Sequence, residues 1–151
     1  MSEPLYQTNQ QGREAITFTV QGVPQAKGSM RQLMRNGKPI IINASNATAT
    51  WQRLVSKEAK LHQPALGPYA GAVRVSLDFR FARPRKTKYL EFPQGKDLDK
   101  LVRCVFDAMT GVTFRDDVQV CDVAASKRYG NPGVTVGVSP LQEFAEATPA
   151  D

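Results

Sequence analysis

The chain has 151 residues, 41% of them hydrophobic and 23% charged, which suits one globular domain and excludes a wholly disordered chain. The 20 Lys and Arg residues outnumber the 14 Asp and Glu residues, and the net charge of +6 favours a polyanionic partner, nucleic acid before an anionic membrane. Short aliphatic runs, a polar N-terminus, two cysteines and one histidine predict no membrane span, secretory signal, disulfide framework or zinc site. We therefore expect a cytoplasmic enzyme or binding protein.

The acidic residues are unevenly distributed. Residues 141–151 hold three acids and no base, and we expect them to form a flexible acidic tail. We expect residues 1–14 to form a flexible N-terminal arm and residues 15–140 to form the domain. Residues 1–140 carry 20 basic and 11 acidic side chains, and six of those acids lie in one short segment where bases also gather. Any proposed function has to account for this cluster of acids within a basic segment. The six acids are Asp97, Asp99, Asp107, Asp116, Asp117 and Asp122.

The first predicted elements are a strand and a hairpin. Residues 15–20 alternate apolar and polar side chains, which is typical of a strand. Residues 22–43 predict a loop or hairpin that turns at Asn36-Gly37 and contains a short strand at 40–42.

A helix is expected next, from residue 46 or 48 to residue 62, before Pro64. One of its faces is apolar and is expected to pack on the core, whereas another carries bases that form either a solvated surface or a stripe for phosphates. The apolar residues are Trp51, Leu54 and Val55, and the bases are Arg53, Lys57 and Lys60.

The second half of the domain contains the most regular patterns. Strict alternation over residues 73–81 predicts a strand, and the Pro-containing, basic segment 83–96 predicts an exposed loop. Residues 98–109 predict an amphipathic helix, because their apolar side chains fill one arc of the helical wheel. A turn at 115–117 and strands at about 119–127 and 133–138 complete a single α+β domain.

Four acids flank the helix predicted at 98–109. Asp97 and Asp99 open it, and Asp116 and Asp117 precede the next strand. We expect a hairpin-like path to return Asp116 or Asp117 to the helix N-terminus, where crowded carboxylates require a proton or a cation, with Mg²⁺ or Mn²⁺ the best match. Such an ion polarises a phosphodiester and activates water. The structural alternative is that Asp97 caps the helix and that Asp116-Asp117 are turn residues.

Other candidate chemistry is weaker. His62 is isolated and is expected to be a surface or capping residue, and Cys104 and Cys121 inert packing residues. Neither a phosphate-binding loop nor a dinucleotide fingerprint is present, so no small-molecule cofactor is expected. Among the aromatic residues near the basic segment, Phe81 is expected to pack in the core, whereas two others are open to stacking on unpaired bases. These two are Tyr89 and Phe92.

Three segments, in this order and spacing, resemble the RusA family of Holliday junction resolvases. The family pattern runs roughly D-x-D-N-x-x-K, then D-A-L-x-G, then D-D-x-Q-V, and the resemblance is clearest over residues 97–122. The opening strand, the loop with Lys27 and Arg31, and the first helix are compatible with the family but less distinctive. The three segments are Asp97-Leu98-Asp99-Lys100-Leu101-Val102-Arg103, Phe106-Asp107-Ala108-Met109-Thr110-Gly111 and Asp116-Asp117-Val118-Gln119-Val120.

The resemblance implies a Mg²⁺-dependent endonuclease that cleaves four-way junctions in DNA recombination and repair. It also implies a homodimer, often encoded by phages or prophages, and a mixed sheet packed with two main helices. Asp97, Asp99 and Asp117 match the catalytic metal-binding acids, and Asp116 matches the neighbouring acid. We expect such a protein in the cytoplasm of a bacterial or phage-infected cell.

Two positions depart from the family pattern. Lys100 stands where the family has Asn, and Arg103 where it has a catalytic-site Lys. An Arg clamps a phosphate but does not shuttle a proton. Activity therefore survives if that Lys acts only through its charge, and the protein is slow or only a binder if its proton matters.

The leading hypothesis is therefore a junction endonuclease in which Arg103 serves as a phosphate or transition-state cation. Two alternatives remain open. One is a nucleic-acid-binding protein without catalysis, and the other is a metal-dependent nuclease that acts on flaps, forks or RNA. The residues predicted to contact DNA are Lys27, Arg31, Arg83, Arg85, Lys86 and Lys100.

Overall fold

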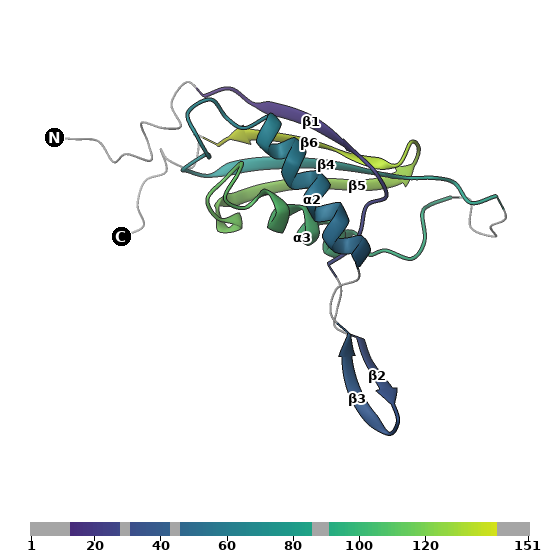
Figure 1. Ribbon diagram of the computed structural model, residues 1–151. Coiled ribbons are helices and arrows are strands. Elements are labelled where there is room, and N and C mark those ends of the chain that lie inside the picture. Colours follow the sequence, from purple (N-terminus) through teal and green to yellow (C-terminus); the bar gives the residue numbers. More distant parts are fainter. Residues whose placement is uncertain (1–12, 28–30, 43–45, 86–90, 142–151) are drawn as a thin grey trace, which may run out of the picture.

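The computed structural model describes residues 13–27, 31–42, 46–85 and 91–141. Its centre is a four-stranded sheet with the order β1-β6-β4-β5 (Figure 1). The pairs β1–β6 and β6–β4 are antiparallel, whereas β4 and β5 are parallel, so the sheet is mixed. The strands are β1 (Ile16–Gln21), β4 (Val73–Phe81), β5 (Val120–Tyr129) and β6 (Gly133–Pro140).

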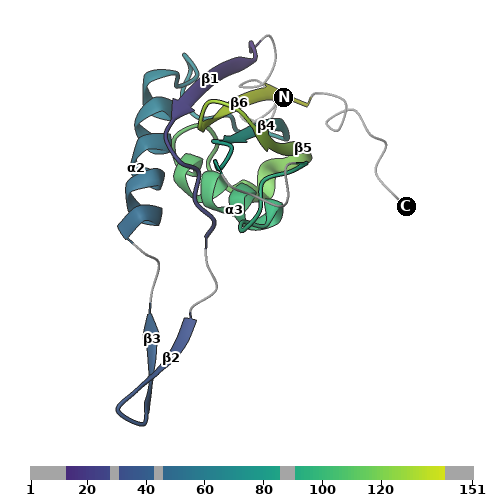
Figure 2. The same cartoon turned by 90° about the vertical axis from the view of Figure 1, so that its right-hand side faces the viewer.

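Two helices, α2 (Asn46–Leu61) and α3 (Leu98–Met109), cover one face of this sheet (Figures 1 and 2). The alternation in β4 explains why: Val73, Val75 and Phe79 are fully buried towards the helices, while their neighbours point to the opposite face. Trp51 of α2 and Leu101 of α3 fill the core from the other side. The predicted α+β domain, a mixed sheet with two helices, is confirmed.

A separate hairpin projects from the end of the body where α2 begins (Figures 1 and 2). It consists of β2 (Arg31–Arg35) and β3 (Lys38–Ile42). Asn36 and Gly37 both have positive φ, 54° and 76°, as a two-residue type I′ turn requires, so the predicted turn is confirmed. The strand predicted at 40–42 is the longer β3, which pairs with β2 along its whole length.

Two predicted packing positions are wrong. Leu54 is 39% exposed, because the buried stripe of α2 follows Thr48, Trp51, Val55 and Ala59 and leaves Leu54 at its border. Cys121 is exposed because β5 is an edge strand and its register with β4 shifts between Val73 and Arg74. That irregularity leaves Cys121 without a register partner in β4.

The predicted arm at 1–14 and acidic tail at 141–151 lie almost wholly outside the described residues and stay predictions. At their borders the chain is anchored: Arg13 donates hydrogen bonds to the carbonyls of Pro68 and Gly67, and the buried Leu141 donates its N–H to Ala72 O at 2.8 Å. Across the described ranges, no helix combines the length and apolar character needed to cross a membrane.

Candidate active site

The first pair of predicted acids lies at the start of α3. Asp97 occupies the N-cap position, but its side chain makes no capping hydrogen bond. Its carboxylate pairs with Lys100, with 3.4 Å between Oδ2 and Nζ, and is 71% exposed. Asp99, in the first helical turn, is exposed as well. Both carboxylates are therefore accessible, and the structural alternative of a capping Asp97 side chain is not what the structure shows.

The second pair lies at a short 3₁₀ helix, η1 (Asp117–Gln119), which directly precedes β5. Asp116 caps this helix: its Oδ1 accepts the Val118 N–H at 3.0 Å, and Gln119 Oε1 accepts the Asp116 N–H at 2.9 Å. Gln119 Nε2 also donates to the carbonyls of Tyr69 and Gly71 at 2.8 and 2.9 Å, which fastens η1 beside the start of β4. Asp116 therefore has a structural role of its own.

Asp117 differs from Asp116 because its pKa is raised. The main cause is a hydrogen bond with the Asp116 side chain, followed by burial and by the negative charges of Asp116 and Asp107. Two adjacent carboxylates hold a shared proton or attract a cation, and oxygen donors of this kind suit a hard divalent ion. The carboxylate oxygens of Asp116 and Asp117 are suitable ligands for such an ion, but this pair supplies only two of the four predicted carboxylates.

The two acidic pairs lie at opposite ends of α3. Asp97 precedes the helix and η1 follows it, and the 12 residues of α3 span about 18 Å. Within the described ranges, no three His, Cys, Asp or Glu side chains come close enough to hold a metal ion. The expected return of Asp116 or Asp117 to the helix N-terminus is therefore wrong for one chain. The physical reason is that β5 runs parallel to β4, so α3 must cross the sheet before β5 begins.

Basic side chains surround the start of α3. The Lys27 N–H donates to Lys100 O at 3.1 Å, while the Lys27 ammonium pairs with Asp107 two turns further along the helix. Lys96 donates to Gln25 Oε1 at 2.6 Å, and burial lowers the pKa of this half-buried lysine. Lys127 of β5 donates to Lys96 O at 2.7 Å. Lys96, Lys100 and Lys127 thus place basic groups at the end of α3 that carries Asp97 and Asp99, whereas the Lys27 ammonium lies near the other end of the helix.

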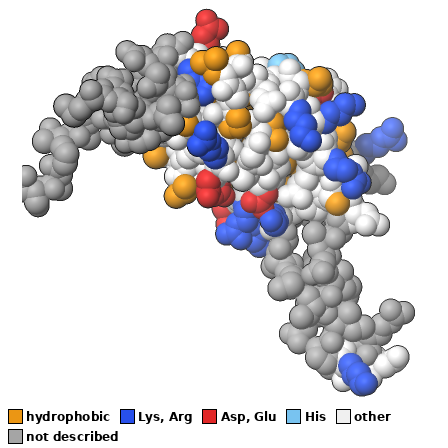
Figure 3. All heavy atoms as spheres, turned by 60° about the vertical axis from the view of Figure 1, so that its left-hand side comes forward, with side chains coloured by type: hydrophobic (Ala, Val, Ile, Leu, Met, Phe, Trp, Pro, Cys, Tyr) orange, Lys and Arg blue, Asp and Glu red, His pale blue; other side chains and the backbone are white. Residues whose placement is uncertain are grey.

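The residues predicted to contact DNA have different environments. Lys27 pairs with Asp107 of α3 and Lys100 with the N-cap residue Asp97. Arg83 is exposed and lies over the Tyr129 ring, 4.8 Å from its centroid. Arg85, like Arg103 on α3, is exposed. On the face in Figure 3, acidic side chains lie directly beside a group of basic ones, and further basic side chains surround them. The side chains of Arg31 and Lys86 lie outside the described residues.

The weaker candidates behave mostly as predicted. His62 is exposed and stacks on Phe18 with 5.7 Å between ring centroids, so it is a surface residue. Burial raises the pKa of the Cys104 thiol to about 11, which keeps it protonated and inert. Phe81 packs against the core and Phe92 is half exposed, whereas Tyr89 lies outside the described residues.

Sequence reasoning assigned no role to Asp107. This half-buried acid lies in the last turn of α3, where it pairs with Lys27 and contributes to the raised pKa of Asp117. Lys27 and Asp107 are 80 residues apart in the chain, so no local pattern indicates that they meet. Only the path of the segment before the hairpin, which lies along α3, brings them together.

Comparison with known proteins shows similarity to a protein family and to a bacterial protein. The sequence model of the family described as endodeoxyribonuclease RusA matches residues 21–139, which includes both helices, both acidic pairs, β4, β5 and all but the last residue of β6. A protein of Bacillus subtilis (strain 168), described as uncharacterized protein YqaN, is 32% identical over 133 residues. That alignment covers 77% of this chain and 89% of the relative.

Proposed function

Because the chain belongs to the RusA endodeoxyribonuclease family, we propose that it cleaves phosphodiester bonds at four-way DNA junctions with the help of a divalent metal ion. The observation that carries the proposal is the exposed Asp97 and Asp99 at the basic end of α3, within the segment that the family pattern matches. This activity would place the protein in DNA recombination and repair, in the cytoplasm of a bacterial or phage-infected cell.

The proposed metal ligands are Asp97, Asp99 and Asp117, with Asp116 beside them. The carboxylate chemistry favours Mg²⁺, with Mn²⁺ as an alternative, over softer metals. The hydrogen bond with the Asp116 side chain is the main cause of the raised pKa of Asp117, and a divalent cation at this pair would take the place of the shared proton. When bound, a divalent ion supplies Lewis acidity towards a phosphodiester.

A single chain does not assemble this ligand set, since its two acidic pairs lie at opposite ends of α3 and the described residues provide no group of three acids. We therefore propose a homodimer in which Asp97 and Asp99 of one chain face Asp117 of the other. A two-fold axis would create two such sites, one for each of the two strands that are cut in a junction.

The remaining residues of the site bind and orient the DNA backbone. Arg103 is exposed on α3 and, as a planar guanidinium, is suited to clamp a phosphate. Lys27 and Lys100 are held by acids in the free protein, so phosphates would compete with Asp107 and Asp97 for them. Bases along α3 would neutralise phosphates and release counterions, which makes DNA affinity strongly dependent on salt.

Cleavage of a synthetic four-way junction tests this function. Wild-type protein should cut the junction in Mg²⁺ and not in EDTA, and Asp99→Asn should abolish cutting while junction binding persists. Asp122→Asn is the matched control, because Asp122 is an exposed acid of β5 that pairs with Arg74 and is not among the proposed ligands. Full cutting by Asp99→Asn would refute the assignment.

The replacement of the family's Lys by Arg103 favours one further candidate, a junction-binding protein without catalysis. Tight junction binding with no cutting in Mg²⁺ or Mn²⁺ would support it. Restored cutting in Arg103→Lys would then show that the lost activity depends on this position. Parallel assays on flaps, forks and RNA identify a nuclease with another target.

A further inference from the structure

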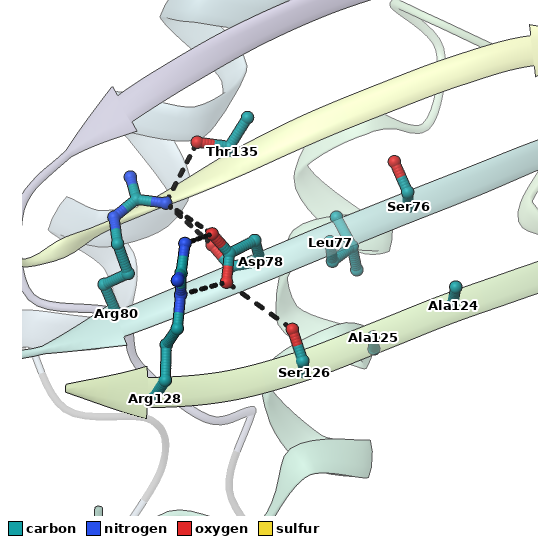
Figure 4. A pocket seen from close by; sticks show the side chains of 9 residues that line it. All are labelled: Ser76, Leu77, Asp78, Arg80, Ala124, Ala125, Ser126, Arg128 and Thr135. Atoms are coloured by element: carbon teal, nitrogen blue, oxygen red, sulfur yellow. Dashed lines mark hydrogen bonds and ion pairs between the residues drawn. The ribbon is translucent and has the colours of Figure 1, made fainter. Parts of the chain in front are cut away.

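The face of the sheet opposite the helices contains an open pocket of about 530 Å³. Three neighbouring strands, β4, β5 and β6, line it (Figure 4). Small side chains such as Ser76 and Ala124 leave it open at one end, and charged side chains gather at the other. Its polar lining consists of Ser76, Asp78, Arg80, Ser126, Arg128 and Thr135.

Two guanidinium groups share one carboxylate in this pocket. Asp78 Oδ2 accepts from Arg80 Nη1 at 3.0 Å and from Arg128 Nη2 at 2.8 Å, and Asp78 Oδ1 accepts from Arg128 Nε at 3.1 Å (Figure 4). Two positive charges against one negative charge leave the group with a net charge of +1. The pocket therefore attracts an anion even though each charged side chain is paired.

The two arginines are held differently. Arg80 is mostly buried, with its side chain 17% exposed, and it also donates to Thr135 Oγ1 at 3.0 Å and to Asn131 O at 3.2 Å. Arg128 is 66% exposed. Asp78 engages Arg128 through Nε and Nη2, along one edge of its guanidinium, which leaves the Nη1 donors to a ligand in the pocket. An aligned and accessible guanidinium suits a phosphate oxygen.

We propose that this pocket binds a backbone phosphate of the DNA substrate, so that Arg128 is a DNA-binding residue on the face opposite α2 and α3. The inference rests on the proposed function, since the pocket would give a branched DNA substrate a second contact surface. Guanidinium and hydroxyl groups both donate hydrogen bonds to phosphate oxygens, and the pocket is open enough to admit a polymer backbone. The source favoured here is DNA because the family acts on it.

The test compares Arg128→Gln with Arg74→Gln. Arg74 lies on the same face in β4, is half exposed and pairs with Asp122 at 2.7 Å, but it does not line the pocket. Each variant loses one positive charge and one ion pair, so the general change in charge is matched. The dissociation constant for a four-way junction is measured in EDTA over a range of salt concentrations, after size-exclusion chromatography and thermal unfolding confirm that both variants keep the wild-type assembly and fold.

Arg128→Gln is expected to weaken junction binding and to reduce the salt slope by about 0.9, the value for one phosphate contact, while Arg74→Gln leaves both near wild type. Ala124→Glu, which places a negative charge in the pocket, should weaken binding further. Equal losses in Arg128→Gln and Arg74→Gln, or no loss in either, would overturn the inference.

A titration with inorganic phosphate separates the two sources of this chemistry. If phosphate stabilises the wild-type protein but not Arg128→Gln, while both bind the junction equally, the pocket takes free phosphate only and the DNA inference is wrong. Failure of the proposed function has a different signature: wild-type protein that binds the junction but does not cut it in Mg²⁺. That result leaves the comparison of Arg128 and Arg74 intact.

Discussion

Mixing two inactive variants tests whether the acidic site is shared between chains. Asp99→Asn and Asp117→Asn should each abolish cutting, because each removes one carboxylate from every site. Oxygen atoms that bind one Mg²⁺ lie within about 4 Å of each other, twice the metal–oxygen distance, whereas α3 separates the two acidic pairs by about 18 Å in one chain. A shared site therefore predicts that the mixture recovers activity that neither variant has.

The size of the recovery follows from the two-fold symmetry. After exchange at equal concentrations, half of the dimers contain one chain of each kind, and each of these has one intact and one doubly altered site. About a quarter of the wild-type sites are then restored. The assay is the initial rate of nicking on a four-way junction, with each variant alone as the control. No recovery after confirmed chain exchange would refute the shared site.

Four further predictions concern single residues. Lys100→Asn, which frees Asp97 from its ion pair, should lower the Mg²⁺ concentration for half-maximal cutting; an unchanged Mg²⁺ titration would show that this pair does not compete with the metal. The pKa of Asp78 is lowered, mainly by the hydrogen bond from Arg128, so the charged carboxylate stabilises the fold at neutral pH. Asp78→Asn should therefore reduce the free energy of unfolding at neutral pH. The difference in free energy of unfolding between wild type and Asp78→Asn should shrink as the pH falls below about 4, because Asp78 becomes protonated. A difference that does not depend on pH would contradict this prediction. A thiol reagent at pH 7 should modify the exposed Cys121 and spare the buried Cys104, as peptide mass spectrometry can determine, and equal modification in the folded protein would be the contrary result. Gly133→Ala should reduce stability by about 1–3 kcal/mol in chemical denaturation, because a Cβ there meets the backbone oxygen of Val20 at 2.4 Å. A Cβ at Gly130 meets the Arg80 side chain at 3.2 Å, a contact that a small shift relieves, so Gly130→Ala should cost less.

The local elements could be predicted from the sequence because each has a strong periodic pattern. The helix at 98–109 and the strand at 73–81 have the predicted bounds, since their apolar side chains repeat with the period of one element and pack on one core. The turn at Asn36-Gly37 was predictable for a different reason, the preference of this pair for positive φ.

The arrangement of the acids could not be predicted in the same way. Strand patterns do not show whether two strands are parallel, and the parallel pairing of β4 with β5 places Asp117 at the far end of α3 from Asp97. The Lys27–Asp107 and Asp78–Arg128 pairs also depend on elements 80 and 50 residues apart. The irregular register at Cys121 has no sequence signal either.

The most direct test of the proposed activity is the rate of strand cleavage on a four-way junction and on a linear duplex of the same sequence, each in Mg²⁺ and in EDTA. The proposed function predicts cutting of the junction in Mg²⁺, little cutting of the duplex, and none in EDTA. Equal cutting of both DNAs, or a bound junction that stays intact in Mg²⁺, would contradict it.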